Sequence, residues 1–415
     1  MSSNEMTSSR LSDLCTQVTD GTHDSPILQP TGVPFIKGTH ISKGYIDFDN
    51  CDFINYTDHL KVIARSKPQR GDILFSNIGS LGDAAFVSTD KEFSIKNVAL
   101  FKPDSRKINN RYLFYYIISS GFQTEIEKKR SGSAQPFLGL ATLRNHTVRH
   151  HIDLSTQNRV AAILSAYDGL IENNIRRIRL LEEMAQTIYR EWFVNFRFPG
   201  HQKVRMVNSP LGKIPEGWEA ATLETLCKEV RRSVQPNKIE PTTPYFGLEH
   251  LPRKSIALAE WGYAGDVQST KLAFLKGEIL FGKIRPYFHK VGVAPVDGVC
   301  SSDAIVIVPK NAEVFGIVLS CVSSEAFVAH ATKTSQGTKM PRANWDVLLK
   351  YCVAMPPRKL LEHFNSLITD IILQIQNMVF RSRNLRQNRD LLLPKLISGE
   401  VDVSELDIEM RGNTP

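Results

Sequence analysis

The chain contains two copies of one pattern, and this repeat constrains its fold more than any other feature. Gly71–Phe75 (Gly-Asp-Ile-Leu-Phe) returns as Gly277–Phe281 (Gly-Glu-Ile-Leu-Phe), 206 residues later (277 − 71). Downstream, a Ser/Gly-containing stretch at Arg130–Pro136 is matched by Thr334–Pro341. The period is about half of the 415 residues, far beyond that of solenoid repeats. Two tandem, domain-sized units predict an approximate two-fold axis. A partner with two related half-sites suits such a protein, and DNA is the obvious one.

The composition is that of an ordinary globular protein of two or three domains. Hydrophobic residues make up 42% and charged residues 23% of the chain, both ordinary values. No apolar run approaches 18 residues, so we expect no membrane span. Met1–Arg10 is polar and lacks a signal-sequence core. The six cysteines are scattered without a C-x-x-C pair, so neither a metal site nor a disulfide framework is expected, and the predicted location is cytoplasmic. The net charge of +8 is compatible with nucleic-acid binding but is shared by many other proteins.

The spacing of apolar residues changes along the chain. Up to about residue 150, short apolar runs separated by Gly, Asn and Asp predict strands, with one helix at Arg111–Ile118. Steps of three and four then predict a helix over Gln157–Trp192, roughly 54 Å long at about 1.5 Å per residue. Pro210–Trp218 resembles a linker into a second strand-rich unit. Pro356-Pro357 introduces a second long helix, which we expect to end near Pro394.

Two apolar stripes of this length cannot be buried by small β-rich domains alone. We therefore predict that the two helices pack on each other as a coiled coil, antiparallel because of the approximate two-fold axis. The predicted fold class is α/β (α+β): two tandem α/β domains separated and joined by two long helices, with pseudo-two-fold symmetry. The predicted pairing residues are Val160, Ile163, Tyr167 and Ile171 on the first helix and Phe364, Leu367, Ile371 and Ile375 on the second.

Several segments resemble the specificity subunits of type I restriction-modification systems. Val160–Asn174 resembles their first conserved region, and Leu391–Val401 resembles the end of the second. Gly212–Trp218 is similar to the usual entry to a second target-recognition domain, and the Gly-Asp/Glu-Ile-Leu-Phe box resembles one found in both recognition domains. Arg358–Leu361 departs from the family pattern, which often has a Gln in an acidic context there. The resemblance covers nearly the whole chain in the family's order.

The resemblance implies four segments and a function. Target-recognition domain 1 would span 1–153, a central conserved helix 154–198, a linker with target-recognition domain 2 199–355, and a second conserved helix with a C-terminal tail 356–415. Each recognition domain would read one half of a bipartite, asymmetric double-stranded DNA target. The helices would set the spacing and dock two modification (methyltransferase) subunits, and restriction subunits would complete the nuclease. This chain would be non-catalytic and without a cofactor, so S-adenosylmethionine, ATP and Mg²⁺ are expected only in partner subunits.

Two other function classes remain open on the residues alone. A self-contained restriction-methylation enzyme would need catalytic motifs. Gly277–Lys283 matches G-x-x-x-x-G-K, but Ile284 stands where a Ser or Thr should hold Mg²⁺, and no Asn/Asp-Pro-Pro-Tyr element is present. Adjacent His150 and His151 are expected to be surface residues facing opposite sides of a strand, rather than metal ligands. A coiled-coil scaffold that binds only protein is the other alternative, and the basic Ser/Gly loops argue against it.

Basic and small polar residues occur at matching places in both repeats. Lys and Arg neutralise phosphates, and Ser, Thr and Gln bond to phosphates or base edges. The cluster at Lys283–Lys290 is basic whereas its counterpart Asn77–Gly82 is neutral, which suits two domains that read different sequences. The candidate DNA-binding residues are Lys37, Thr39, His40, Asn77, Lys129, Arg130, Ser131, Ser133 and Gln135 in the first repeat, and Lys283, Arg285, Tyr287, Lys290, Gln336, Thr338 and Lys339 in the second.

Overall fold

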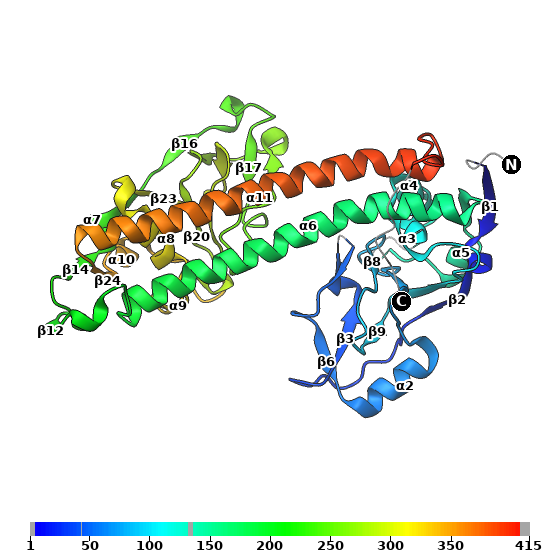
Figure 1. Ribbon diagram of the computed structural model, residues 1–415, viewed down its shortest axis with the longest axis horizontal. Coiled ribbons are helices and arrows are strands. Elements are labelled where there is room, and N and C mark those ends of the chain that lie inside the picture. Colours follow the sequence, from blue (N-terminus) through cyan, green and yellow to red (C-terminus); the bar gives the residue numbers. More distant parts are fainter. Residues whose placement is uncertain (1–4, 43, 132–135, 407–415) are drawn as a thin grey trace. The chain divides into compact units, whose positions relative to one another are not determined.

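The computed structural model describes residues 5–42, 44–131 and 136–406 and divides into two compact units. Unit 1 comprises residues 1–169 and 385–415, and unit 2 comprises 170–384. Two long helices, α6 (Leu154–Tyr189) and α11 (Arg358–Ser398), each contribute a segment to both units (Figure 1). This mixed α/β architecture with two long helices confirms the predicted fold class.

Unit 1 is built around a four-stranded sheet in the order β2-β10-β7-β8. A three-stranded sheet, β6-β3-β9, and the pairs β1-β11 and β4-β5 complete its strands. Its strands are β1 (Met6–Arg10), β2 (Cys15–Asp20), β3 (Val33–Lys37), β4 (Ile41–Ser42), β5 (Tyr45–Ile46), β6 (Asp52–Ile54), β7 (Ile73–Phe75), β8 (Ala84–Phe86), β9 (Ser94–Lys96), β10 (Ala99–Pro103) and β11 (Thr147–His151). Its shorter helices are α1 (Leu11–Leu14), α2 (Tyr56–Ser66), α3 (Asn110–Ile118), α4 (Ser120–Lys128) and α5 (Leu140–Arg144).

Unit 2 repeats the four-stranded order as β15-β23-β20-β21 and the terminal pair as β14-β24. Its second sheet has five strands, β16-β19-β22-β17-β18. A hairpin, β12-β13, has its turn and second strand in the predicted linker, while its first strand precedes the linker. The strands are β12 (Met206–Ser209), β13 (Gly212–Pro215), β14 (Glu219–Thr222), β15 (Cys227–Glu229), β16 (Arg232–Val234), β17 (Pro244–Phe246), β18 (Gly262–Tyr263), β19 (Lys271–Phe274), β20 (Ile279–Gly282), β21 (Val291–Val293), β22 (Gly298–Cys300), β23 (Ala304–Pro309) and β24 (Cys352–Met355). The shorter helices are α7 (Leu223–Leu226), α8 (Phe315–Val322), α9 (Glu325–Lys333) and α10 (Trp345–Leu348).

The repeated Gly-Asp/Glu-Ile-Leu-Phe box forms the turn into β7 and β20. Gly71 and Gly277 have φ of +91° and +87°, a left-handed conformation that favours glycine. The carboxylate that follows accepts a hydrogen bond from the backbone N–H three residues earlier, at 2.8 Å for both Asp72 and Glu278. The three apolar residues after it are buried on both faces of their sheet and contribute alternately to two cores. The box is therefore a structural element, and Gly277–Lys283 leads through a strand rather than forming a phosphate-binding loop before a helix.

In unit 2 the long helices run antiparallel. Asn174 on α6 donates to the hydroxyl of Ser382 on α11 at 3.2 Å. Fifteen residues later, Tyr189 at the end of α6 contacts the ring of Phe364, and so does Phe193 in the π-helical turn Arg190–Val194 that follows, with centroids 6.4 and 4.5 Å apart. The pairing thus moves backwards along α11 as it moves forwards along α6. Glu182 fastens α6 to the same unit, because its Oε1 accepts hydrogen bonds from Ser255 Oγ and from two backbone N–H groups.

In unit 1 the helix segments meet around a partly buried polar cluster. The hydroxyl of Tyr115 on α3 donates to Asp168 Oδ2 of α6 at 2.6 Å. Arg389 Nη1 of α11 donates to the other carboxylate oxygen, also at 2.6 Å. Val160 and Leu164 lie in the same core as Leu396. Three elements distant in sequence are therefore joined at one carboxylate.

The predicted pairing residues are all at least partly buried. Val160, Ile171, Phe364, Ile371 and Ile375 are buried, and Ile163, Tyr167 and Leu367 are half-buried. Two expectations about this region were wrong. The second helix continues through Pro394 and ends at Ser398, and the adjacent histidines are not at the surface. His150 and His151 are buried at the end of β11, where His150 Nε2 bonds to Ser9 Oγ at 3.2 Å and His151 Nε2 bonds to the carbonyl of Leu396 at 3.3 Å.

No single helix among the described residues is long and apolar enough to cross a membrane, although the bent pair Ala312–Val322 and Glu325–Lys333 meets the same test by length and composition.

Candidate nucleic-acid interface

Three segments carrying predicted site residues meet in unit 1. They are the turn after β3 (37–40), the loop from β7 to β8 (76–83), and the connection from α4 to α5 (129–139). A Cβ on Gly38 would lie 2.5 Å from Ser76 Oγ, so the turn lies directly on the β7–β8 loop. The N–H of Gly79 donates to the carbonyl of Pro136 at 3.1 Å, and the N–H of Leu138 to that of Asn77 at 2.8 Å. The structure therefore joins the separate sequence clusters into one surface.

The same construction recurs in unit 2 around the loop from β20 to β21 (283–290). The N–H of Arg285 donates to the carbonyl of Pro341 at 2.7 Å, and that of Ala343 to Lys283 at 2.8 Å. Lys290 Nζ reaches the carbonyl of Leu248 in the turn after β17. These contacts match those of unit 1 segment by segment.

A histidine closes the equivalent turn in each unit. The N–H of Lys37 donates to His40 Nδ1 at 3.1 Å, and the N–H of Gly247 donates to His250 Nδ1 at 3.0 Å. An imidazole that accepts this bond must be unprotonated at Nδ1. Burial lowers the pKa of His40, with the nearby Asp52 carboxylate opposing the shift. The predicted site residue His40 thus shapes the turn through its ring nitrogen.

Two residues that the sequence interpretation missed stand at the centre of these surfaces. Phe137 pairs with Ile78 on one side and Ser131 on the other. At the equivalent place in unit 2, Arg342 pairs with Ile284 and Gln336. The alignment of Pro136 with Pro341 offered a signal for both, since each is the next residue along the chain.

The remaining predicted residues of unit 1 differ in their burial and in whether their side chains are paired. Asn77 is 4% exposed and its amide donates to the carbonyl of Leu138 at 3.1 Å, so it fastens the loop. Lys37 is paired with Asp52 at 2.5 Å, and Arg130 with Glu127 at 2.7 Å. Thr39, Lys129 and Ser131 are exposed. Ser133 and Gln135 lie outside the described residues.

In unit 2 the predicted residues are exposed or half-buried. Tyr287 is 50% exposed, and Gln336, Thr338 and Lys339 are exposed. Arg285 is half-buried with φ of +48°, where its unit 1 equivalent is Gly79. A left-handed non-glycine costs about 1 kcal/mol or more and is often found at functional sites.

One carboxylate lies close to two cations of the unit 2 surface. Asp303 Oδ1 lies 3.8 Å from Arg342 Nε and 4.0 Å from Lys283 Nζ. Lys283 Nζ also donates to the carbonyl of Ser302 at 2.6 Å. Asp303 is about a third exposed (33%) and attracts both cations, although neither is within hydrogen-bond distance of it. The sequence analysis did not identify Asp303 as part of this surface.

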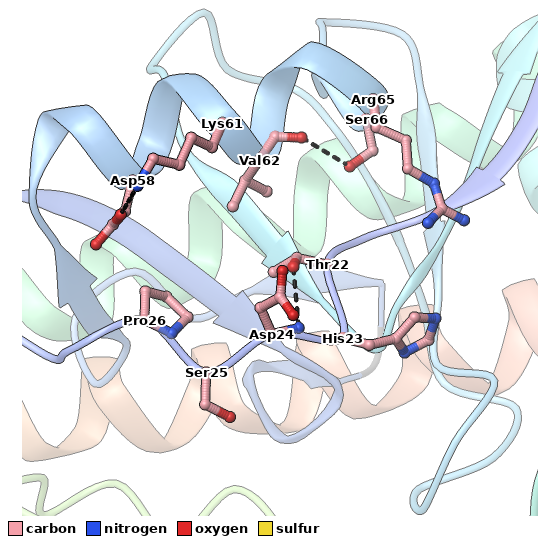
Figure 2. Close-up of a pocket in the computed structure, with 10 residues that line it drawn as sticks. All are labelled: Thr22, His23, Asp24, Ser25, Pro26, Asp58, Lys61, Val62, Arg65 and Ser66. Atoms are coloured by element: carbon pink, nitrogen blue, oxygen red, sulfur yellow. Dashed lines mark hydrogen bonds and ion pairs between the residues drawn. The ribbon is translucent and has the colours of Figure 1, made fainter.

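Unit 1 also contains a pocket of about 480 Å³ between Thr22–Pro26 and α2 (Figure 2). Its wall includes Lys61, His23 and Arg65, and the last two pair with Asp20. Asp24 and Asp58 also line the pocket, so acidic and basic side chains are mixed there. Among the described residues, no group of three or more His, Cys, Asp or Glu side chains is placed to hold a metal ion.

Comparisons with known proteins identify the family. Residues 3–183 match the type I restriction modification DNA specificity domain. The MjaIX specificity subunit of Methanocaldococcus jannaschii is 24% identical over 72% of this chain and 70% of its own. The HindI specificity subunit of Haemophilus influenzae is 21% identical over 85% of this chain and 91% of its own. The chain belongs to the type I restriction-modification specificity subunits.

A solved structure has the same fold. The type I S subunit from M. genitalium superposes with a TM-score of 0.57 at 14% identity, covering 95% of this chain and 96% of that one. As a member of this family, the chain is a DNA specificity subunit, a non-catalytic component of a type I restriction-modification complex. The enzyme and scaffold alternatives are thereby set aside.

Proposed function

We propose that each unit of this specificity subunit reads one half of a bipartite, asymmetric double-stranded DNA target. The observation that carries the proposal is the three-segment surface, built with matching backbone hydrogen bonds in both units but carrying different side chains. A common scaffold with different side chains is suited to reading two different base sequences.

The exposed cations of each surface supply affinity rather than discrimination. Lys129 in unit 1 and Lys339 in unit 2 are both exposed, and they lie on equivalent connecting segments of the two units. A lysine that neutralises one phosphate releases counterions whatever the base sequence. We expect Lys129→Ala or Lys339→Ala to weaken binding to all sequences similarly and to flatten the salt dependence of log K by roughly one.

The long helices would set the spacing between half-sites and dock two modification subunits. Apolar side chains remain exposed on α6 in unit 2, where Leu180 is 53% and Met184 is 52% exposed. Leu373 of α11 is 51% exposed in the same unit. Exposed apolar side chains on rigid helices suit protein docking. Restriction subunits complete the proposed assembly, and S-adenosylmethionine, ATP and Mg²⁺ are assigned to the partner subunits. The six free cysteines fit a cytoplasmic location.

The half-site assignment is tested by methylation maps from cells that carry the complete system. Tyr287→Ala in unit 2 and Thr39→Ala in unit 1 change exposed side chains on the two surfaces. We expect each variant to alter one half of the methylated sequence and leave the other intact. A change in both halves from either variant would contradict the proposal that one unit reads one half.

The spacing role is tested by lengthening both helices together. Inserting seven residues after Asn174 and seven at Ser382, where the helices contact each other, adds about 10 Å and preserves the pairing face. The tolerated spacer should grow by roughly three base pairs, given about 3.4 Å per base pair. An unchanged spacer in a folded double-insertion variant would disprove the spacing role.

Docking is tested by co-purification with the modification subunit. Leu180→Glu with Met184→Glu should abolish the complex, because charge replaces the exposed apolar side chains. Glu183→Ala, at an exposed position of the same helix, is the matched control and should leave the complex intact.

A further inference from the structure

Phe137 and Arg342 occupy the same place in the two units. The N–H of each donates to the partner strand, to Ser131 at 2.9 Å and to Gln336 at 2.8 Å, and each carbonyl accepts in return at 3.0 Å. The following residue in each case donates to the β7–β8 or β20–β21 loop at 2.8 Å. Their backbones are therefore held from both sides, in the middle of three short segments joined by isolated β-bridges, which we call the platform.

The platform presents one row of side chains in each unit. Residues directly opposite each other in antiparallel pairs project to the same face. The row is Ile78, Phe137 and Ser131 in unit 1, and Ile284, Arg342 and Gln336 in unit 2. The isoleucine is common to both rows, and the two side chains beyond it differ in chemistry.

Both central side chains are solvent-accessible and held by a rigid backbone. Phe137 is 46% exposed, high for a phenylalanine whose backbone is hydrogen-bonded on both sides. The side chain of Arg342 is 52% exposed, and its only described ion pair is at Nε, 3.8 Å from Asp303. The Asp303 carboxylate attracts the Nε edge of the guanidinium from beyond hydrogen-bond distance, and the terminal nitrogens are the donors that would meet a base.

Arginine and glutamine carry specific base chemistry. Arginine bonds bidentately to O6 and N7 of guanine, and glutamine to N6 and N7 of adenine, whereas an apolar side chain contacts the thymine methyl group. Arg342 and Gln336 are cross-strand neighbours, about 5 Å apart at Cβ, and so can reach adjacent base pairs. Phe137 and Ser131 offer an apolar contact and one weak hydrogen bond.

We propose that Arg342, beside Asp303, reads a guanine in the second half-site with Gln336 on a neighbouring adenine, and that Phe137 reads a thymine methyl group in the first half-site. This inference rests on the proposed function, since it assigns bases to the surface of each unit. The two half-sites differ at this position because the same platform carries a cation in one unit and an aromatic ring in the other.

The test for Arg342 uses the complex with modification subunits and DNA containing the target from its methylation map. Replacing the assigned guanine by 7-deazaguanine removes N7 and should weaken binding by the unaltered complex about 5- to 150-fold. Arg342→Ala should bind both DNAs equally and should methylate sites with any base at that position. Arg342→Lys keeps the charge but not the planar fork, so its map should relax less than that of Arg342→Ala, with an unchanged salt dependence.

The test for Phe137 replaces thymine by uracil, which lacks only the C5 methyl group. The unaltered complex should lose several-fold in affinity at one position of the first half-site, and Phe137→Ala should show no such difference. The reciprocal change, Phe137→Arg with Ser131→Gln, should replace that thymine by guanine in the methylation map.

Lys339→Ala is the matched control, because it removes an exposed charge beside the row without touching it. It should weaken binding to all DNA sequences alike and leave the methylation map unchanged. A map unaltered in Arg342→Ala, while Tyr287→Ala still changes only the second half-site, would overturn this inference and leave the proposed function standing. A change in the first half-site from Arg342→Ala would overturn both.

Discussion

Units 1 and 2 each have a central four-stranded sheet of the same strand order, and they differ in the elements around that sheet. The orders β2-β10-β7-β8 and β15-β23-β20-β21 correspond strand for strand. The second sheets differ in what lies next to the matching strands β9 and β22. In unit 1 helix α2 packs there, with His59 bonded to Ser94 at 2.9 Å. In unit 2, β19 pairs with β22 and carries β16 at its edge. Strands buried on both faces tolerate little change, whereas an edge accepts either a helix or another strand.

The attachment to the long helices also differs between the units. Unit 1 joins α3, α6 and α11 at the carboxylate of Asp168. Unit 2 uses Glu182 to hold the 255–257 segment against α6, and packs aromatic rings around Phe364. Burial raises the pKa of Glu182 while its three hydrogen bonds oppose the shift. The two units therefore reach the same architecture through different contacts, and this difference can be tested.

The largest effect is expected from removing a core aromatic in one unit at a time. Phe364 is fully buried in unit 2, and Phe122 is 2% exposed in unit 1. Truncating either to Ala should cost about 3–5 kcal/mol, because it removes buried area and leaves a cavity. Amide hydrogen exchange should show lost protection in the strands of the altered unit. Equal loss in both units from either variant would show that their stabilities are not separable.

A smaller effect is expected from the polar attachments. Asp168→Ala leaves the buried hydroxyl of Tyr115 and the guanidinium of Arg389 without their acceptor in α6, and should cost about 2–3 kcal/mol. Glu182→Ala leaves two backbone N–H groups without their carboxylate and should cost about 1–3 kcal/mol. Urea unfolding with hydrogen exchange measures both. Asp168→Ala should lower the hydrogen-exchange protection of unit 1, and Glu182→Ala should lower that of unit 2. The reverse pattern would contradict the assignment of these attachments.

The repeated glycine provides a finer comparison. Both glycines have positive φ, but a Cβ on Gly71 would lie 2.7 Å from Asn110 Nδ2, whereas a Cβ on Gly277 would meet nothing within 4 Å. Gly277→Ala should therefore cost only the left-handed strain, about 1–2 kcal/mol. Gly71→Ala should cost about 1 kcal/mol more, because the Asn110 amide must give up its 2.9 Å bond to the Gly71 carbonyl. Equal costs in thermal unfolding would show that Asn110 moves freely.

The smallest effect is expected from mild acidification. Burial lowers the pKa of His40, His59, His146 and His151 in unit 1, and of His289 in unit 2. A histidine whose folded pKa lies below its unfolded value near 6.5 stabilises the fold fully above that value, and this contribution is lost as pH falls through the folded pKa. Between pH 7.5 and 6.5 each should contribute less than about 1 kcal/mol. Hydrogen exchange should show unit 1 losing protection first, and earlier loss in unit 2 would contradict this ranking.

Much of the architecture could be predicted because it depends on periodicity and repetition. The 3.6-residue stripe indicated both long helices, and the repeated box placed a strand in each unit. The end of α11 was misjudged because the tertiary packing of Leu393, Leu396 and Ile397 holds the helix together past Pro394. Adjacent histidines also gave no sign of their burial, since alternation along β11 does not reveal that its end is covered on both faces.

The candidate surface was only partly foreseeable. The basic Ser/Gly segments were found because composition shows them, and the segments that carry them do meet. Phe137 and Arg342 were missed because neither belongs to a charged cluster, and Asp303 because its role depends on two cations from other segments. Asn77 was assigned to the surface although its amide fastens the loop from within. A side chain's direction depends on backbone pairing, which composition does not contain.

The sequence by itself determined the tandem units, the two long helices and the family, because these follow from local periodicity and from motifs that are contiguous along the chain. Only the tertiary structure decided which residues share a surface. The row of Ile284, Arg342 and Gln336 joins three segments through backbone hydrogen bonds. Every residue type except proline can donate and accept such bonds, so the sequence carries little direct record of where they form.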